Sequence, residues 1–237
     1  MPAWDALEVL IRGNCRFQVG RPEHTRKSEY EKQTARNPIA IVVGCGDPGA
    51  DNRRALDVPV GNGGIFQLKN AGARYISDYA DDIVLLIQKK GVRLVLVLTH
   101  TDCAAIGITC QHFYHREPTR ALGVVRDVIP AFEKTAREGD TGTPAHVQRA
   151  TRRSAMWNAK LIRDDARIMG ISGPRGSAEE IVVVAGTYNL LGKTIEFFGE
   201  EARNRQQRIY AEMNIPWPFA KESPGAAAPT LASAAGK

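Results

Sequence analysis

The sequence predicts an α/β fold with a mainly parallel β-sheet flanked by helices. Three apolar runs rich in β-branched residues support this prediction, at 39–43, 92–98 and 181–186. Continuous runs of this kind are typical of parallel strands that are buried on both faces of a sheet. The segment 75–90 has apolar residues at helical spacing and lies between a strand expected at 65–69 and the run at 92–98. A strand, helix, strand order predicts a parallel pair joined by a right-handed crossover.

Before the first strand, apolar residues at helical spacing predict an N-terminal helix over 4–17. We expect this helix to fray at Gly13-Asn14, because both residue types favour helix ends. Residues 20–37 are polar and lack a period, which predicts an extended connection. After the first strand, Asp51 is expected to cap a short helix that holds Arg53 and Arg54.

The second half of the chain is predicted to contain further helices and the last strand of the sheet. Residues 104–169 are predicted to be helical, with a break at 139–144. A turn and a strand over 193–198 are expected to end the sheet, and a last helix is predicted over 200–213.

The composition is typical of a globular protein that can bury a substantial core. The chain has 237 residues, of which 43% are apolar and 24% are charged. We expect one α/β domain over residues 1–220, in which residues 1–37 form an N-terminal helix and arm. Residues 221–237 are rich in Ala, Pro, Ser and Gly, a composition typical of a disordered tail.

Several classes of protein are disfavoured by the same sequence. No apolar run approaches the roughly 20 residues of a membrane span, and the N-terminus lacks the pattern of a secretory signal. We therefore expect a cytoplasmic location and no membrane association. The net charge is +6, but the basic residues are spread among acidic ones, which argues against a nucleic-acid groove. An anionic small substrate or an acidic partner suits the same charge.

Two thiols and an imidazole stand at the ends of predicted strands. Cys45 follows the run at 39–43, and His100 and Cys103 follow the run at 92–98. The carboxyl ends of parallel strands meet at one edge of a sheet, where ligands bind. Three such ligands are the number found in a catalytic zinc site with an open fourth position. The sequence therefore predicts a metal site at this edge.

Two carboxylates lie beside the predicted ligands. Asp47 is two residues beyond Cys45, so it can hold a metal-bound water in place, or it can ligate the metal itself and close the site. Asp102 lies between His100 and Cys103 and is expected to cap the turn or to orient the imidazole.

Four segments occur in the order and spacing of the β-class carbonic anhydrases, a family that the chain resembles over about residues 4–110. They are Gly13-Asn14-Cys15-Arg16-Phe17, Cys45-Gly46-Asp47, Lys69-Asn70-Ala71-Gly72 and His100-Thr101-Asp102-Cys103. The resemblance implies that Cys45, His100 and Cys103 bind Zn²⁺ and that Asp47 is the catalytic carboxylate. It implies a lyase that hydrates carbon dioxide to bicarbonate by zinc-bound hydroxide. It also implies a homodimer or an assembly of dimers, with the N-terminal helix packed on the partner.

The chain departs from the family pattern at two positions. Gly49 stands where the family usually has an arginine that pairs with the aspartate, and Ala104 stands where a glycine usually follows the last ligand. Asp47 can then close the site as a fourth ligand, or Arg53 or Arg54 can restore the pairing, which is our hypothesis. The site can also act on carbonyl sulfide or carbon disulfide, or it can be a catalytically silent zinc site in a protein that binds partners.

A small substrate needs a small pocket beside the metal. We expect Ile65 and Phe66 to line it with apolar surface, and Ala71 and Gly72 to allow close approach because their side chains are small or absent. The methyl group of Ala104 is expected to narrow the same pocket.

Overall fold

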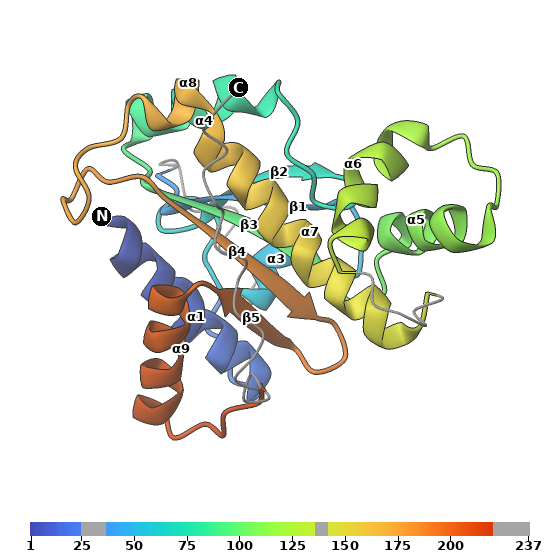
Figure 1. Ribbon diagram of the computed structural model, residues 1–237. Helices are drawn as coiled ribbons and strands as arrows, with labels where there is room; N and C mark the ends of the chain where they lie inside the picture. The colour runs from blue at the N-terminus through green and yellow to red at the C-terminus, as the bar shows by residue number, and fades with distance from the viewer. Residues whose placement is uncertain (25–36, 136–141, 220–237) are drawn as a thin grey trace.

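The computed structural model describes residues 1–24, 37–135 and 142–219. Its strands form one sheet, in the spatial order β2 (Ile65–Asn70), β1 (Ala40–Cys45), β3 (Leu94–His100), β4 (Val182–Asn189) and β5 (Thr194–Phe198). The first four strands are parallel, and β5 pairs antiparallel with β4 (Figure 1). The predicted fold class is confirmed. The tail predicted over 221–237 and most of the predicted arm lie outside the described residues.

Strand β1 lies between β2 and β3 and pairs with both of them. Ala40 is opposite Ile65 on one side and Leu94 on the other. The strands at 65–70 and 94–100 are parallel, as predicted, but they are not neighbours, because the crossover passes over β1. Every residue of β1 and β3 is buried, as expected for central strands covered on both faces.

Helices cover both faces of the sheet and its carboxyl end. The helices are α1 (Ala3–Gln18), α3 (Asn52–Ala55), α4 (Tyr79–Lys90), α5 (Ala104–His115), α6 (Leu122–Glu133), α7 (Pro144–Asp164), α8 (Ala166–Met169) and α9 (Glu200–Glu212). One apolar cluster contains residues of α1, α3 and α9, a second contains residues of α4, α7 and α8, and a third joins α5, α6 and α7 beside Cys45 and Cys103. Figure 1 shows α1 and α9 side by side on one face, with α5 and α6 beyond the ends of the strands.

Helix α1 does not fray at Gly13 and Asn14, so that prediction was wrong. The helix continues to Gln18, and both residues are buried. A Cβ atom on Gly13 would lie 1.9 Å from the carbonyl oxygen of Leu56, so the glycine allows the helix to touch the backbone beyond α3. The apolar face of α1 packs on its own chain. The partner contact predicted for this helix therefore stays a prediction for its remaining surface.

The outer edge of β5 is closed by two buried side-chain amides. Asn14 of α1 accepts a hydrogen bond from the backbone amide of Ile195 at 2.9 Å and donates to the carbonyl of Lys193 at 3.0 Å. Gln206 of α9 accepts from the amide of Phe197 at 3.2 Å and donates to the carbonyl of Ile195 at 2.6 Å. These bonds replace the ladder that a further strand would form.

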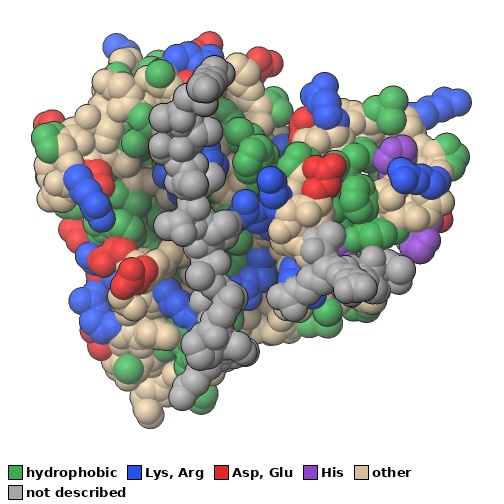
Figure 2. All heavy atoms as spheres, in the orientation of Figure 1, with side chains coloured by type: hydrophobic (Ala, Val, Ile, Leu, Met, Phe, Trp, Pro, Cys, Tyr) green, Lys and Arg blue, Asp and Glu red, His purple; other side chains and the backbone are tan. Residues whose placement is uncertain are grey.

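Two arginines of α9 form ion pairs with α1. Arg205 and Arg208 both bond to Glu8. On the face shown in Figure 2, basic side chains are spread over several elements with acidic ones between them. Within the described residues, no helix combines the length and the apolar character needed to cross a bilayer.

Asn14→Ala is expected to lower the free energy of unfolding by roughly 2 to 5 kcal/mol, since it leaves three backbone groups without partners. These groups are the amide of Ile195 and the carbonyls of Lys193 and Ala55. Urea unfolding measures the effect. Asn204→Ala removes an exposed amide on α9 and serves as the matched control. Equal stability of the two variants would contradict the role given to Asn14.

Candidate metal centre

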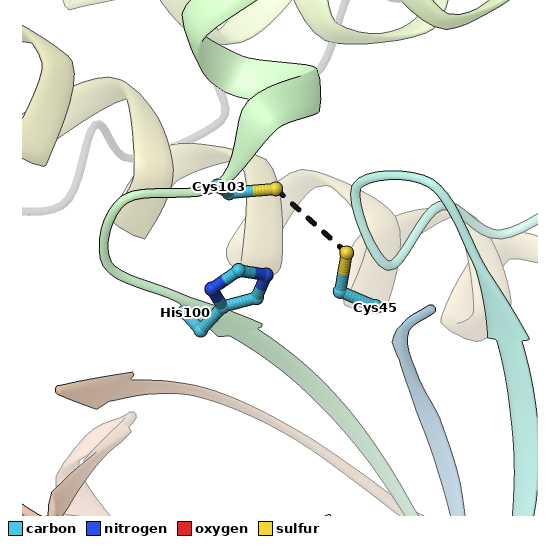
Figure 3. A group of neighbouring side chains, drawn as sticks. All are labelled: Cys45, His100 and Cys103. Carbon is cyan, nitrogen blue, oxygen red and sulfur yellow. Dashed lines mark hydrogen bonds between the residues drawn. The ribbon is translucent and has the colours of Figure 1, made fainter. Parts of the chain in front are cut away.

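Cys45, His100 and Cys103 lie together at the carboxyl end of the sheet. Cys45 is the last residue of β1 and His100 the last of β3, and these two strands are parallel neighbours. Cys103 follows after a short turn and directly precedes α5. All three are buried, and their ligand atoms lie within 4.8 Å of one another. Figure 3 shows the two thiols and the imidazole turned toward one another. The predicted juxtaposition of the three ligands is present.

The imidazole of His100 is oriented by a backbone carbonyl. Its Nδ1 lies 2.8 Å from the carbonyl oxygen of Thr101, so Nδ1 carries the proton and donates it to this hydrogen bond. Its Nε2 is buried and has no hydrogen-bond partner in the described part of the chain. The expected orienting group, the Asp102 carboxylate, is not the partner of His100. Asp102 instead has a left-handed backbone conformation (φ 58°), which turns the chain toward Cys103.

An unpaired polar atom in a buried position is unfavourable unless a ligand satisfies it. The Nε2 atom of His100 faces two sulfur atoms, and two thiolates with one imidazole form a ligand set that suits zinc. The residues present therefore fit a zinc ion. A metal would join all three ligands and satisfy the imidazole nitrogen, which the described protein atoms leave unpaired.

The two sulfur atoms lie 3.8 Å apart, and this proximity controls their protonation. The neighbouring Cys103 thiol and His100 imidazole, aided by the backbone amides of Gly72 and Asp47, outweigh burial and hold the pKa of Cys45 well below its ordinary value. The resulting thiolate, together with burial, raises the pKa of Cys103. Burial opposes protonation of His100, but the Cys45 thiolate, the Thr101 carbonyl and the Asp47 carboxylate together outweigh it and raise the pKa of the imidazole. A bound cation would favour both thiolates.

The Asp47 carboxylate is held by a backbone amide. Its Oδ1 accepts a hydrogen bond from the amide of Gly49 at 2.7 Å, within a turn closed by the Ala50 amide and the Asp47 carbonyl at 3.0 Å. Among the described residues, no arginine forms a hydrogen bond or ion pair with this carboxylate. The hypothesis that Arg53 or Arg54 pairs with Asp47 therefore has no support in these contacts.

Arg54 has a different neighbour. Its guanidinium carbon lies 5.8 Å from the centre of the Phe17 ring, a cation–π contact with α1. The backbone amides of Arg53 and Arg54 bond to Asp51, which confirms the predicted cap of α3. Among the described residues, the partner of the Asp47 carboxylate is thus the backbone amide of Gly49 and not an arginine side chain.

Three of the five expected pocket residues lie beside the metal ligands. The amide of Gly72 donates to the sulfur of Cys45 at 3.4 Å. A Cβ atom on Gly72 would lie 3.1 Å from that of Ala105, so a side chain would be crowded there. Ala71 precedes Gly72 and is exposed, and Ala104 is the exposed first residue of α5.

Within one chain, the register places Ile65 and Phe66 away from this site, and their part in the substrate pocket stays a prediction. The register pairs Asn70 with Cys45 and Ile65 with Ala40, so Ile65 stands at the opposite end of the strands. Five residues of extended chain separate Ile65 from the Cys45 row by roughly 16 Å. Apolar character alone did not reveal the end of the strand at which these residues lie.

Backbone groups complete the site, and sequence motifs did not identify them. The Thr101 carbonyl, the Gly72 amide and the Gly49 amide each bond to one of the predicted side chains. The available signal was indirect: a glycine in the turn after a strand permits a close approach of its amide.

Comparisons with known proteins agree with this geometry. A family model described as carbonic anhydrase matches residues 40–190. The Mycobacterium tuberculosis protein named Carbonic anhydrase 2 is 28% identical over 193 residues, which cover 79% of this chain and 87% of that protein. A carbonic anhydrase of Mycolicibacterium smegmatis is 30% identical over 132 residues, covering 54% of this chain and 60% of that protein.

Solved structures share the fold at low sequence identity. A Coccomyxa β-carbonic anhydrase in complex with acetazolamide superposes with a TM-score of 0.59 at 13% identity, covering 78% of this chain and 89% of its own. A tetrameric β-carbonic anhydrase from Sordaria macrospora has a TM-score of 0.58 at 14% identity, covering 70% and 83%.

We expect the purified protein to bind about one zinc ion per chain, and Cys45→Ser and His100→Ala to abolish this binding, because three ligands are the usual minimum for a protein zinc site. Metal content after dialysis against a weak chelator measures the effect. Cys110→Ser, which changes a buried thiol outside the group of three, is the matched control and should keep its zinc. Retention of zinc by either ligand variant would contradict the assignment.

Proposed function

Because the chain belongs to the β-class carbonic anhydrase family, we propose that it hydrates carbon dioxide to bicarbonate at a zinc site formed by Cys45, His100 and Cys103. The observation that carries the proposal is the buried Nε2 of His100, which lacks a partner in the described structure and faces two thiols. A bound zinc ion supplies a Lewis acid that lowers the pKa of water and makes a nucleophile available near neutral pH.

Two thiolates would neutralise the charge of a divalent cation. They therefore favour tight binding of the metal but leave a water bound to it less acidic. The hydrogen bond from the Gly72 amide to the Cys45 sulfur withdraws some of the thiolate charge and opposes this weakening. The carbonyl of Thr101 keeps the proton of His100 on Nδ1 and leaves Nε2 as an electron-pair donor.

Asp47 is proposed to orient the reacting water. The amide of Gly49 engages its Oδ1, and within the described residues the other oxygen, Oδ2, has no hydrogen-bond partner. This oxygen is available to accept a hydrogen bond from water. The bond to Gly49 also holds the carboxylate in the turn, which supports an open site over one that Asp47 closes as a fourth ligand.

The small residues around the ligands suit a small substrate. We propose that Ala71, Gly72 and Ala104 leave room for a linear triatomic molecule beside Cys45 and Cys103. Carbonyl sulfide has the same shape, so the identity of the substrate needs an assay rather than a geometric argument.

We also propose that the chain forms a homodimer or an assembly of dimers in the cytoplasm. The similar Sordaria macrospora enzymes are described as tetrameric. Light scattering of the purified protein should give at least twice the chain mass, whereas a monomer across the micromolar range would contradict the proposal.

Stopped-flow hydration of carbon dioxide with a pH indicator tests the activity. Asp47→Asn is expected to lower kcat/KM about 100-fold while zinc content stays unchanged, because the amide keeps an acceptor for Gly49 but orients water poorly. Asp78→Asn changes an exposed carboxylate at the start of α4 and is the control.

The same enzyme preparation should release little sulfide from carbonyl sulfide. Faster sulfide release than carbon dioxide hydration would instead assign a carbonyl sulfide hydrolase. Absence of both activities in zinc-loaded protein would favour a catalytically silent zinc site.

A further inference from the structure

The loop between β2 and α4 brings a backbone donor onto a predicted metal ligand. The amide of Gly72 lies 3.4 Å from the sulfur of Cys45. Gly72 and the next residue, Ala73, both have positive φ angles, of 85° and 53°. This conformation costs little for glycine but is unfavourable for alanine, so the surrounding contacts must maintain the loop.

Part of this support lies within the loop itself. The side chain of Asn70 accepts a hydrogen bond from the backbone amide of Arg74 at 2.8 Å and donates one to the carbonyl of Arg74 at 2.7 Å. These reciprocal bonds join the two ends of the loop. They hold Asn70 close to Arg74, but they do not connect the loop to Cys45.

The remaining support comes from the guanidinium of Arg74. Its Nε donates to the carbonyl of Ala71 at 2.9 Å, and its Nη1 bonds to the carboxylate of Asp127 and to the carbonyl of Gly123 at 3.4 Å. Asp127 and Gly123 belong to α6. One side chain therefore connects the peptide before Gly72 to a separate helix.

Burial favours this connection. The side chains of Arg74 and Asp127 are only 15% and 26% exposed, so their ion pair is less screened than a pair at the surface. Val128, the next residue on α6, lies 3.8 Å from the position that a Cβ atom of Gly72 would take. Helix α6 therefore bonds to the loop through Gly123 and Asp127, and its Val128 lies close to Gly72.

We propose that Arg74 and Asp127 act as positioning residues, which hold the Gly72 amide on the sulfur of Cys45 by tying the loop to α6. The inference rests on the metal assignment of the proposed function and extends it to a pair of residues outside the ligand set. A hydrogen bond to a metal-binding thiolate lowers the energy of the sulfur electrons and fixes the direction of the ligand. Loosening of the loop should change both properties without removal of any ligand.

Cobalt-substituted full-length protein provides a readout that does not depend on activity. Arg74→Gln is expected to shift the sulfur-to-cobalt charge-transfer band to longer wavelength, because loss of the amide hydrogen bond raises the energy of the sulfur electrons. It should also weaken metal binding about tenfold in chelator competition, at the lower end of the usual effect of groups that support a ligand. Asp127→Asn should move both measurements in the same direction by a smaller amount.

Arg126→Gln is the matched control. Arg126 bonds to the other oxygen of the same carboxylate, Oδ1 of Asp127, at 3.0 Å, but its side chain is 80% exposed and extends to solvent. Its replacement should leave the cobalt spectrum and the affinity at wild-type values. Urea unfolding of each variant checks that the fold is retained, and Asp127→Asn decides the question if Arg74→Gln does not fold.

The outcomes distinguish a wrong positioning role from a wrong metal assignment. A cobalt–thiolate band in the wild type that is unchanged in Arg74→Gln and Asp127→Asn would overturn the positioning role and leave the metal assignment intact. A wild type without such a band would overturn the metal assignment and this inference with it. Equal shifts in Arg126→Gln and Arg74→Gln, which each remove one positive charge beside Asp127, would show a general effect of charge and would also overturn the proposal.

Discussion

The parallel register between β1 and β3 is the constraint on which the candidate site depends. Gly44 is opposite Leu98, so Cys45 leaves β1 beside the end of β3 that carries His100. Successive residues of a strand point to opposite faces, and a slip of one residue would turn Cys45 to the other face of the sheet. Burial of every residue in both strands fixes the register, since a slip would exchange two well-packed apolar faces. The core of the sheet therefore determines the geometry of the ligands.

A second feature concerns how the side chains of the site are oriented. His100, Cys45 and Asp47 each bond to a backbone group in a turn that follows a strand. Backbone groups in closed turns move little and lose no side-chain entropy when they bond. The loop after β2 shows the cost of this arrangement, because the positive φ angle of Ala73 requires contacts from outside the loop to maintain it.

The sequence predicted the strands and the three ligands because both depend on local patterns, namely apolar runs and the polar residues that end them. It predicted the Asp51 cap for the same reason. Gly13 and Asn14 were misassigned to a helix end because propensity favours that position, whereas close packing and buried hydrogen bonds keep them inside α1. The end of β2 at which Ile65 and Phe66 lie could not be predicted, because apolar character does not reveal register. The backbone partner of Asp47 could not be predicted from residue types, since every residue except proline carries an amide.

The amides that close the edge of β5 also have a consequence for the order of folding. Asn14 and Ile195 are separated by 181 residues, and Asn14 belongs to the first helix of the chain. The part of the edge that Asn14 covers therefore stays open until the first helix docks on β5, and contacts of such long range form slowly. During that interval β5 presents unpaired backbone groups beside the apolar side chains of Ile195 and Phe197, a combination that promotes association between incomplete chains. Docking of the N-terminal helix thus acts as a late safeguard against aggregation as well as a source of stability.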